Sequence, residues 1–168
     1  GQGALLSNTT GQYNVAVGQN SLRTQTTANN NTALGYQTLF YTTGGSNVAV
    51  GYAALVYNSS GTANNAFGYQ ALYSNTSGSN NTAVGTNSLY ANTTAGTNTA
   101  VGRDSLRYNT TGAANVAVGY QALEDNTTAA SNTAIGYQAL NKNTTGQQNV
   151  AVGNFAIDAN TTGDYNTG

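Results

Sequence analysis

The chain has 168 residues with four basic and five acidic side chains, so only 5% of it is charged, against about 25% in an average soluble protein. It contains no His, Cys, Met, Trp or Pro, which excludes imidazole and thiol catalysis, His or Cys metal ligation and disulfides. Four basic residues are too few to bind a nucleic-acid backbone, and the short apolar runs predict no membrane insertion by this segment.

A repeat of 17 residues organises the whole chain. Each unit begins with a glycine that follows a short apolar sequence, as Gly18 follows NVAV, and these glycines are 17 residues apart except across a deletion in 41–44. Numbered from this glycine, the consensus is G-Y-Q-A-L-x-x-N-T-T-G-x-x-N-(T/V)-A-V. We interpret 1–168 as a single array of ten units and, because no initiator Met is present, as a fragment of a longer fibrous protein.

Positions 14–17 of each unit are rich in Val and Thr and predict a strand, first at 14–17 and then at 31–34, 47–50, 64–67, 81–84, 98–101, 115–118, 132–135 and 149–152. Glycine at position 1 ends this strand, and positions 2–6 predict a second one. N-T-T-G at positions 8–11 is typical of a polar loop. Since units of this length are too short for helix pairs, we predict an all-β fold: a β-solenoid with two strands per coil and about ten coils, stacked about 4.8 Å apart.

Stacking places equal positions of successive coils above one another, which predicts ladders of side chains. Position 14 is Asn in all ten units, and we expect these residues to form an amide ladder. Its members are Asn14, Asn31, Asn47, Asn64, Asn81, Asn98, Asn115, Asn132 and Asn149, continued by Asn166. The same register predicts stacked tyrosines (Tyr36, Tyr52 and Tyr69; Tyr120 and Tyr137; Tyr73 and Tyr90) and charge pairs one coil apart (Arg107 and Glu124; Asp125 and Lys142).

Two features indicate that a single chain does not suffice. The apolar groups of each coil, chiefly at positions 5 and 17, offset too little of the conformational entropy that ordering the coil costs. Position 16 is Ala in nine units, which suggests close approach by another surface, while position 17 on the opposite side of the strand is always apolar. We therefore expect a symmetric homotrimer of parallel chains.

Asn at position 8 begins an N-x-S/T sequon in eight units, so these residues are candidate glycan-attachment sites in a glycosylating secretory pathway. The alternative is that polar loop chemistry matches the three-residue pattern by composition. The eight are Asn8, Asn58, Asn75, Asn92, Asn109, Asn126, Asn143 and Asn160, and Asn30 and Asn80 begin two further sequons.

Other chemistry has little support, and we predict no catalytic, cofactor-binding or metal-binding residues. Glu124 and Asp158 share position 6 at about 9.6 Å, the outer edge of the separation in inverting glycosidases, and Arg107 beside Glu124 opposes the raised pKa of a catalytic acid. No unit concentrates acidic metal ligands. Thr rows at positions 9 and 10 leave an ice-binding solenoid as an alternative function, and the sequons leave a glycosylated extracellular filament subunit.

The motif Asn-(Val/Thr)-Ala-(Val/Ile)-Gly followed by Tyr-Gln-Ala, at 115–122 and 132–139, resembles the head repeats of trimeric autotransporter adhesins and the repeats of phage tail fibres. The resemblance covers all ten units, although the adhesin repeat is shorter and lacks the N-T-T-G loop. It implies a left-handed β-roll, three parallel chains and an extracellular role, on a cell surface or a virion, as a fibre shaft or adhesin stalk in attachment to cells. The partners it implies are further copies of the chain and a host cell-surface glycan or protein.

Overall fold

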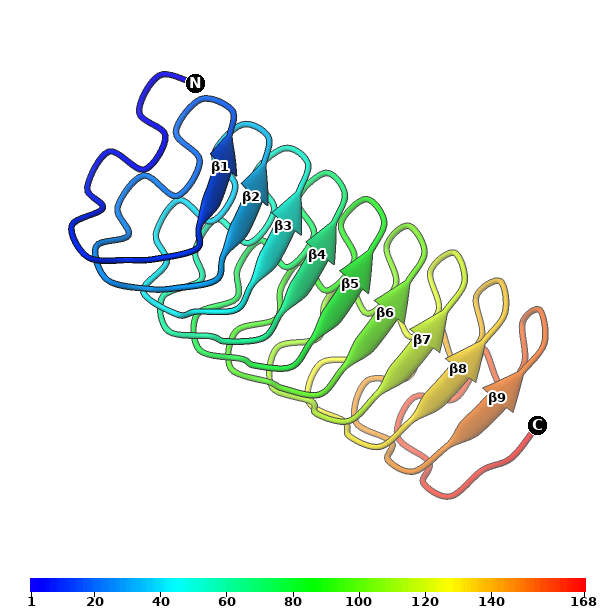
Figure 1. The fold of residues 1–168 in the computed structure, drawn as a ribbon. Helices are drawn as coiled ribbons and strands as arrows, with labels where there is room; N and C mark the ends of the chain where they lie inside the picture. The colour runs from blue at the N-terminus through cyan, green and yellow to red at the C-terminus, as the bar shows by residue number, and fades with distance from the viewer.

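The computed structural model describes all 168 residues, which form one elongated solenoid of stacked coils (Figure 1). Nine coils contribute one three-residue strand each, and the strands form a single parallel sheet in chain order. The strands are β1 Val15–Val17, β2 Thr32–Leu34, β3 Val48–Val50, β4 Asn65–Phe67, β5 Thr82–Val84, β6 Thr99–Val101, β7 Val116–Val118, β8 Thr133–Ile135 and β9 Val150–Val152. The last coil adds an isolated parallel bridge between Val150 and Thr167. The predicted β-solenoid with a 17-residue coil is thus confirmed.

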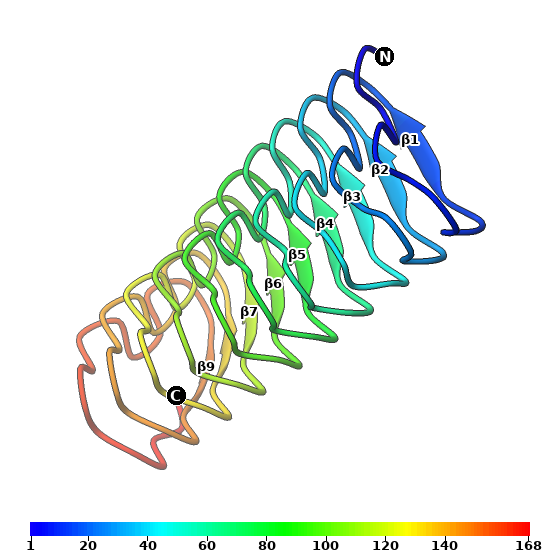
Figure 2. The same ribbon diagram turned by 90° about the vertical axis from the view of Figure 1, so that its left-hand side faces the viewer.

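The sheet keeps the sequence repeat in register from end to end. Ala16 lies opposite Ala33, and Ala33 lies opposite Ala49, so the deletion in 41–44 shortens a loop without shifting the strands. Figure 2 shows the strands in line along one side of the solenoid and the turn segments stacked away from them. The chain contains no helix with the length and apolarity needed to cross a membrane.

The predicted second strand at positions 2–6 is wrong, because each coil contains only one strand. Positions 3 and 5 instead have left-handed backbone, and φ at position 5 lies between 48° and 52° in every coil. Alternate N–H groups therefore point in opposite directions along the axis. Gln121 N donates to the Arg103 carbonyl of the preceding coil, and Leu123 N donates to the Ala139 carbonyl of the following coil, both at 3.0 Å. The segment bonds to both neighbouring coils without being a β-strand.

A thin apolar interior runs along the solenoid. It consists of Leu at position 5, Ala at position 16 and, in several coils, Ala at position 4, and the eight leucines from Leu22 to Leu140 are fully buried. Burying each Leu contributes about 1.5–3 kcal/mol, which offsets the roughly 1–2 kcal/mol that a left-handed conformation costs a residue with a Cβ.

The expectation that Ala at position 16 contacts a partner chain is wrong. These alanines point into the coil, where the inner members such as Ala117 have no exposed surface and pack in the same cluster as the leucines. Alanine is required there because Leu at position 5 fills the narrow interior.

Glycine at position 1 permits the close stacking of the coils. Its φ lies between 128° and 142° from Gly18 to Gly153, and a Cβ on Gly119 would overlap the carbonyl oxygen of Gly136 in the next coil. Of 103 backbone hydrogen bonds, 87 lie outside the strands. Pairing between coils thus extends around the coil instead of being confined to the sheet.

Candidate functional site

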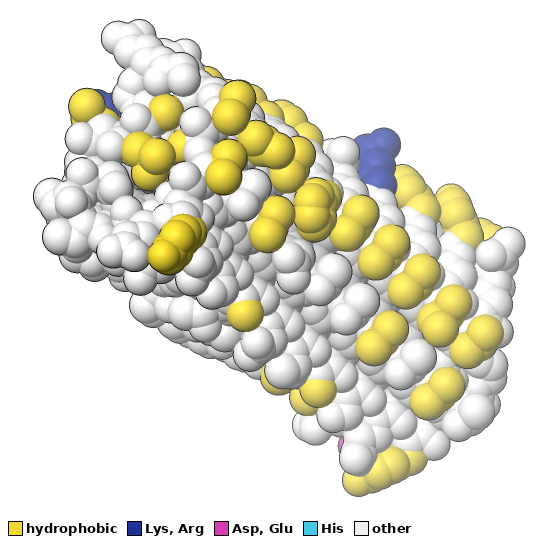
Figure 3. All heavy atoms as spheres, in the orientation of Figure 1, with side chains coloured by type: hydrophobic (Ala, Val, Ile, Leu, Met, Phe, Trp, Pro, Cys, Tyr) yellow, Lys and Arg dark blue, Asp and Glu magenta, His cyan; other side chains and the backbone are white.

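The outer surface of the sheet, here called the strand face, consists of the side chains at positions 15 and 17. Position 17 forms an unbroken apolar row: Val17, Leu34, Val50, Phe67, Val84, Val101, Val118, Ile135 and Val152. Five of its inner members are 36–41% exposed, and Figure 3 shows apolar side chains, in yellow, following one another across the strands. Since parallel sheets are normally covered on both faces, this row is a candidate contact surface.

The asparagines at position 14 lie one above another as the sequence predicts, but the ladder is mainly between side chain and backbone. The Oδ1 atom of each Asn accepts the backbone N–H of the next; for example, Asn115 N lies 2.9 Å from Asn98 Oδ1. The Nδ2 atom of Asn98 donates to the carbonyl oxygen of Gly112 at 2.9 Å. Side-chain to side-chain bonds occur at some steps, such as Asn81 Nδ2 to Asn64 Oδ1 at 3.1 Å. The ladder thereby holds the start of each strand to the loop of the next coil.

A second amide ladder, at position 8, was not predicted. Asn126 Nδ2 donates to Asn109 Oδ1 at 2.8 Å and also to the Ala129 carbonyl oxygen at 3.1 Å, so both of its amide hydrogens are used. Equivalent bonds connect Asn58, Asn75, Asn92, Asn109, Asn126, Asn143 and Asn160. The sequence signal was the near-invariance of position 8, which we interpreted as loop chemistry.

The position 8 ladder is interrupted near the deletion. Gln25 takes the place of Asn in the second coil and Thr42 in the third, and Gln25 Oε1 is buried without a hydrogen-bond partner. Thr42 donates its hydroxyl to the Gly44 carbonyl and accepts from Asn58 Nδ2 at 3.1 Å. The ladder therefore lacks one side-chain hydrogen bond, between the second and third coils.

The ladder also determines where the sequons lie. Six of the eight position 8 asparagines, Asn58, Asn75, Asn92, Asn109, Asn126 and Asn143, are fully buried, and Asn8 and Asn160 are half-buried. Asn30 and Asn80, at position 13, are exposed. The folded coil therefore presents the position 13 sequons to solvent and encloses the inner ones at position 8.

Threonines at positions 9 and 10 differ in their bonding. In seven of the ten coils the position 9 hydroxyl donates to a carbonyl of the following coil, as Thr110 Oγ1 does to Thr127 O at 3.0 Å. Thr111 and its equivalents at position 10 are exposed. Because most position 9 hydroxyls are engaged, only the position 10 row as a whole has hydroxyls free to order water.

The segment at positions 2–7, here called the turn flank, carries the predicted aromatic stacks. Tyr52 stacks on Tyr36 and Tyr69 with ring centroids 5.2 and 5.1 Å apart, and Tyr73 stacks on Tyr90 at 5.1 Å. These predictions are confirmed, as is the pair of Tyr120 and Tyr137. Because stacked rings cover one another's faces, the middle of each stack offers only ring edges to a ligand.

The close packing of these rings affects the pKa of Tyr73. Interaction with the Tyr57 side chain, burial, and the neighbouring Tyr90 and Tyr52 raise the pKa of Tyr73 to about 12. The rings of Tyr57 and Tyr73 meet edge to face at 5.1 Å.

The charge pairs predicted from the register are confirmed. Lys142 Nζ lies 2.9 Å from Asp125 Oδ2, and this hydrogen bond raises the pKa of Lys142. Arg107 lies 4.0 Å from Glu124 and also 3.5 Å from Asp104, a contact the repeat pattern did not predict. Eight of the nine charged residues occupy the turn flank, and Asp164 is the exception.

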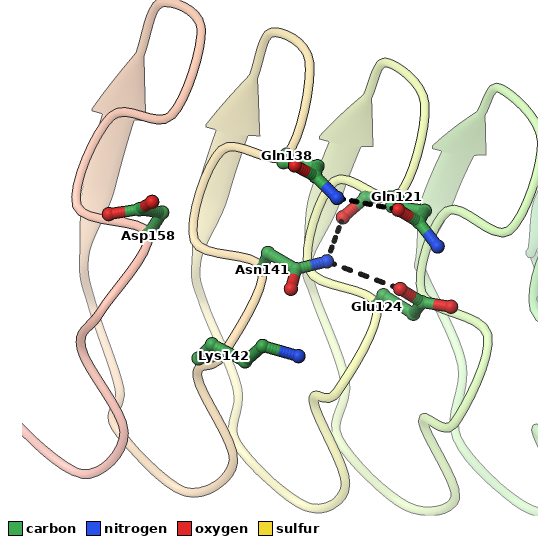
Figure 4. Close-up of a pocket in the computed structure, with 6 residues that line it drawn as sticks. All are labelled: Gln121, Glu124, Gln138, Asn141, Lys142 and Asp158. Carbon is green, nitrogen blue, oxygen red and sulfur yellow. Dashed lines mark hydrogen bonds between the residues drawn. The ribbon is translucent and has the colours of Figure 1, made fainter.

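A polar hollow opens on the turn flank at the high-numbered end of the solenoid, where position 6 is occupied by Glu124, Asn141 and Asp158. It has a volume of about 290 Å³ and is lined by Gln121, Glu124, Gln138, Asn141, Lys142 and Asp158. Figure 4 shows these side chains coming from three successive coils. A second hollow lies in the same rows at the other end of the solenoid, lined by Gln2, Gly3, Leu6, Gln19, Asn20 and Arg23.

Between the two hollows, apolar and aromatic side chains pack on the turn flank. Phe40 and Val56 are buried there, with Ala53 beside them and Tyr73 packed against the group.

The hollow brings Glu124 and Asp158 to one surface, but no three His, Cys, Asp or Glu side chains gather as a metal-binding group. Comparison with protein-family models, with curated protein sequences and with solved structures finds no match for the chain.

Proposed function

We propose that the chain is the shaft of an extracellular fibre, in which three copies pack in parallel with their strand faces toward a common axis. The observation that carries the proposal is the apolar row at position 17, which extends over all nine strands. A continuous apolar row of this length on a parallel sheet favours burial against another protein surface.

The two positions of the strand face differ in how much their polarity varies. Position 15 is Val only where position 17 is also Val, in β1, β3, β7 and β9. The three bulkiest residues at position 17, Leu34, Phe67 and Ile135, follow Thr32, Asn65 and Thr133. Position 17 thus stays apolar even beside a Thr or Asn at position 15, which favours position 17 as the contact row.

A second copy of the chain fits this face better than an unrelated partner. In a parallel cyclic assembly each coil meets its own copies at the same height, so a charge on the strand face would meet a like charge. Positions 15 and 17 contain no charged residue in any strand, although the turn flank contains eight. The resemblance to trimeric adhesins and tail fibres supports three copies.

The shaft would act through its geometry. Ten coils at the β spacing extend about 45 Å, and coil-to-coil hydrogen bonds around the perimeter favour a stiff rod. Such a rod holds a receptor-binding domain away from its anchor on a virion or a bacterial surface.

The mass of the particle in solution tests the assembly. We expect light scattering to give three chains for the wild type and a smaller, still folded or partly folded species for Phe67→Asp, which places a charge in the position 17 row. Thr111→Asp, on an exposed loop, is the matched control and should keep three chains. A wild-type protein that is folded and monomeric would contradict the proposal.

A further inference from the structure

The polar hollow at the high-numbered end of the turn flank combines free hydrogen-bonding groups with an unusual lack of apolar lining. Gln138 Nε2 donates to Gln121 Oε1 at 2.7 Å, and Asn141 Nδ2 donates to the Gln121 carbonyl at 3.0 Å and to Glu124 Oε2 at 3.2 Å. These bonds, drawn in Figure 4, fix the three amides in place. None of the six lining residues is hydrophobic.

The fixed amides leave other polar atoms without partners in the protein. Gln138 Oε1 and Asn141 Oδ1 accept no hydrogen bond, and Gln121 Nε2 donates none. Asn141 is only 5% exposed, so its position is set by the surrounding coils. Amides that are held in position and still have free acceptors are groups that a bound ligand can satisfy.

The charges around the hollow select among polar ligands. Lys142 is paired with Asp125, and Arg107 is shared between Glu124 and Asp104. Asp158 has no basic partner, so its carboxylate is available to a ligand and makes the hollow unfavourable for an anion. A carboxylate and amide oxygens accept hydrogen bonds from hydroxyl groups, and the free amide N–H can donate to one.

An aromatic ring lies next in the same row. Phe155 occupies position 3, where the two preceding coils have Gln138 and Gln121, and it is 52% exposed. It meets Tyr137 edge to face, with the ring planes at 67°, so the two rings do not cover each other as the stacked tyrosines do. Phe155 therefore adds an exposed aromatic surface beside the polar groups.

We propose that this hollow binds a neutral saccharide, with Asp158, Asn141 and Gln138 accepting hydrogen bonds from its hydroxyl groups. The proposal names a ligand class for the shaft of the proposed function, but it depends on no residue of the strand face. Loss of saccharide binding would leave the trimer intact, and a monomeric chain could still bind, so the two proposals fail separately.

Titration of the 168-residue chain by NMR tests the site, with the side-chain amide signals of Gln121, Gln138 and Asn141 as the readout. The neutral probes are maltotetraose, cellotetraose and chitotetraose, at up to about 10 mM, a concentration that reveals dissociation constants in the millimolar range. Sialyllactose and calcium chloride are the contrasting probes. We expect at least one neutral probe to shift all three amides saturably, and sialyllactose to bind at least tenfold more weakly.

Two matched variants locate the binding. Asp158→Ala and Asp164→Ala each remove one carboxylate from the same coil, but Asp164 lies outside the hollow and accepts a hydrogen bond from Gln147 N. We expect Asp158→Ala to weaken binding about tenfold or more, since hydrogen bonds to a charged group are the stronger ones, and Asp164→Ala to leave it unchanged. Gln138→Ala is a second variant should Asp158→Ala perturb the backbone signals.

Three outcomes overturn the proposal. One is that no neutral probe shifts the amides. Another is that calcium chloride alone shifts them while the saccharides do not, which would identify a cation site. The third is equal weakening by Asp158→Ala and Asp164→Ala, which would indicate a nonspecific effect of charge.

Discussion

Asn126 donates a hydrogen bond from its side-chain nitrogen to Asn109 Oδ1 at 2.8 Å, and Asn109 in turn donates to Asn92 Oδ1 at 3.0 Å. Both residues are fully buried. Each amide is therefore donor and acceptor at once, which an isosteric carboxylate cannot be.

Asn109→Asp should destabilise the solenoid strongly at neutral pH. The carboxylate would face the Asn92 oxygen and the Gly112 carbonyl, to which Asn109 now donates, and a buried charge without a partner costs about 3–5 kcal/mol. Because burial raises the pKa of such a carboxyl, the loss should shrink as the pH falls and the acid becomes a donor. Urea unfolding at several pH values measures this, with Thr111→Ala as the exposed control. An equal loss at all pH values would contradict the explanation.

A buried asparagine at position 8 should not carry a glycan while its coil is folded. Asn109 Nδ2 uses both of its hydrogens in bonds to the protein, and a glycan would replace one of them. Peptide mapping of folded protein secreted from glycosylating cells should find the six buried asparagines unmodified, and any glycans confined to the accessible sequons such as Asn30 and Asn80. Glycosylated Asn109 in protein that retains its β-sheet circular dichroism would refute this.

At position 5, the shape of the side chain should matter more than its volume. Leu106 is fully buried and has φ of 49°. Leu106→Met, unbranched and of similar volume, should cost less than about 1.5 kcal/mol. Leu106→Ile should cost clearly more, because a β-branched residue fits left-handed backbone poorly. Thermal or chemical unfolding of the two variants compares them directly, and equal stabilities would show that the left-handed conformation carries no such penalty.

The tyrosine stack predicts a loss of stability in alkali. The pKa of Tyr73 is raised from 10.0 to about 12 in the folded chain, so between these pH values the unfolded chain binds fewer protons than the folded one. The free energy of unfolding should then fall as the pH rises through this window, with the full contribution retained below pH 10. Tyr73→Phe should reduce the alkaline loss, and Tyr13→Phe, an exposed tyrosine outside the stacks, should not. Unfolding midpoints of the wild type and of both variants, measured between pH 10 and about 12, test this prediction.

The repeat was sufficient to predict what depends on register. Once equal positions lie one coil apart, the Asn98–Asn115 ladder contact, the tyrosine stacks and the Lys142–Asp125 pair follow from arithmetic alone. The one-residue deletion did not disturb this, because a polar loop absorbs it. The hollow could not be predicted, since it depends on how the side chains at positions 3 and 6 of three successive coils lie relative to one another.

The conformation of positions 2–6 was also beyond sequence reasoning. Tyr-Gln-Ala-Leu at 120–123 has the composition of a strand, and nothing local marks Gln121 or Leu123 as left-handed, a conformation that side chains with a Cβ seldom adopt. Hydrogen bonds to both neighbouring coils and the burial of Leu123 determine it instead. Ala117 was assigned to the wrong surface for a related reason: its environment depends on the interior that Leu123 fills.

The position 8 ladder gives the solenoid an electrical direction. From Asn58 to Asn160 each amide donates toward the preceding coil and accepts from the following one. The dipoles of these side chains therefore add along the axis, as peptide dipoles do in a helix, with the positive end toward the low-numbered coils. A rod with a net charge of only −1 thus has two electrostatically distinct ends.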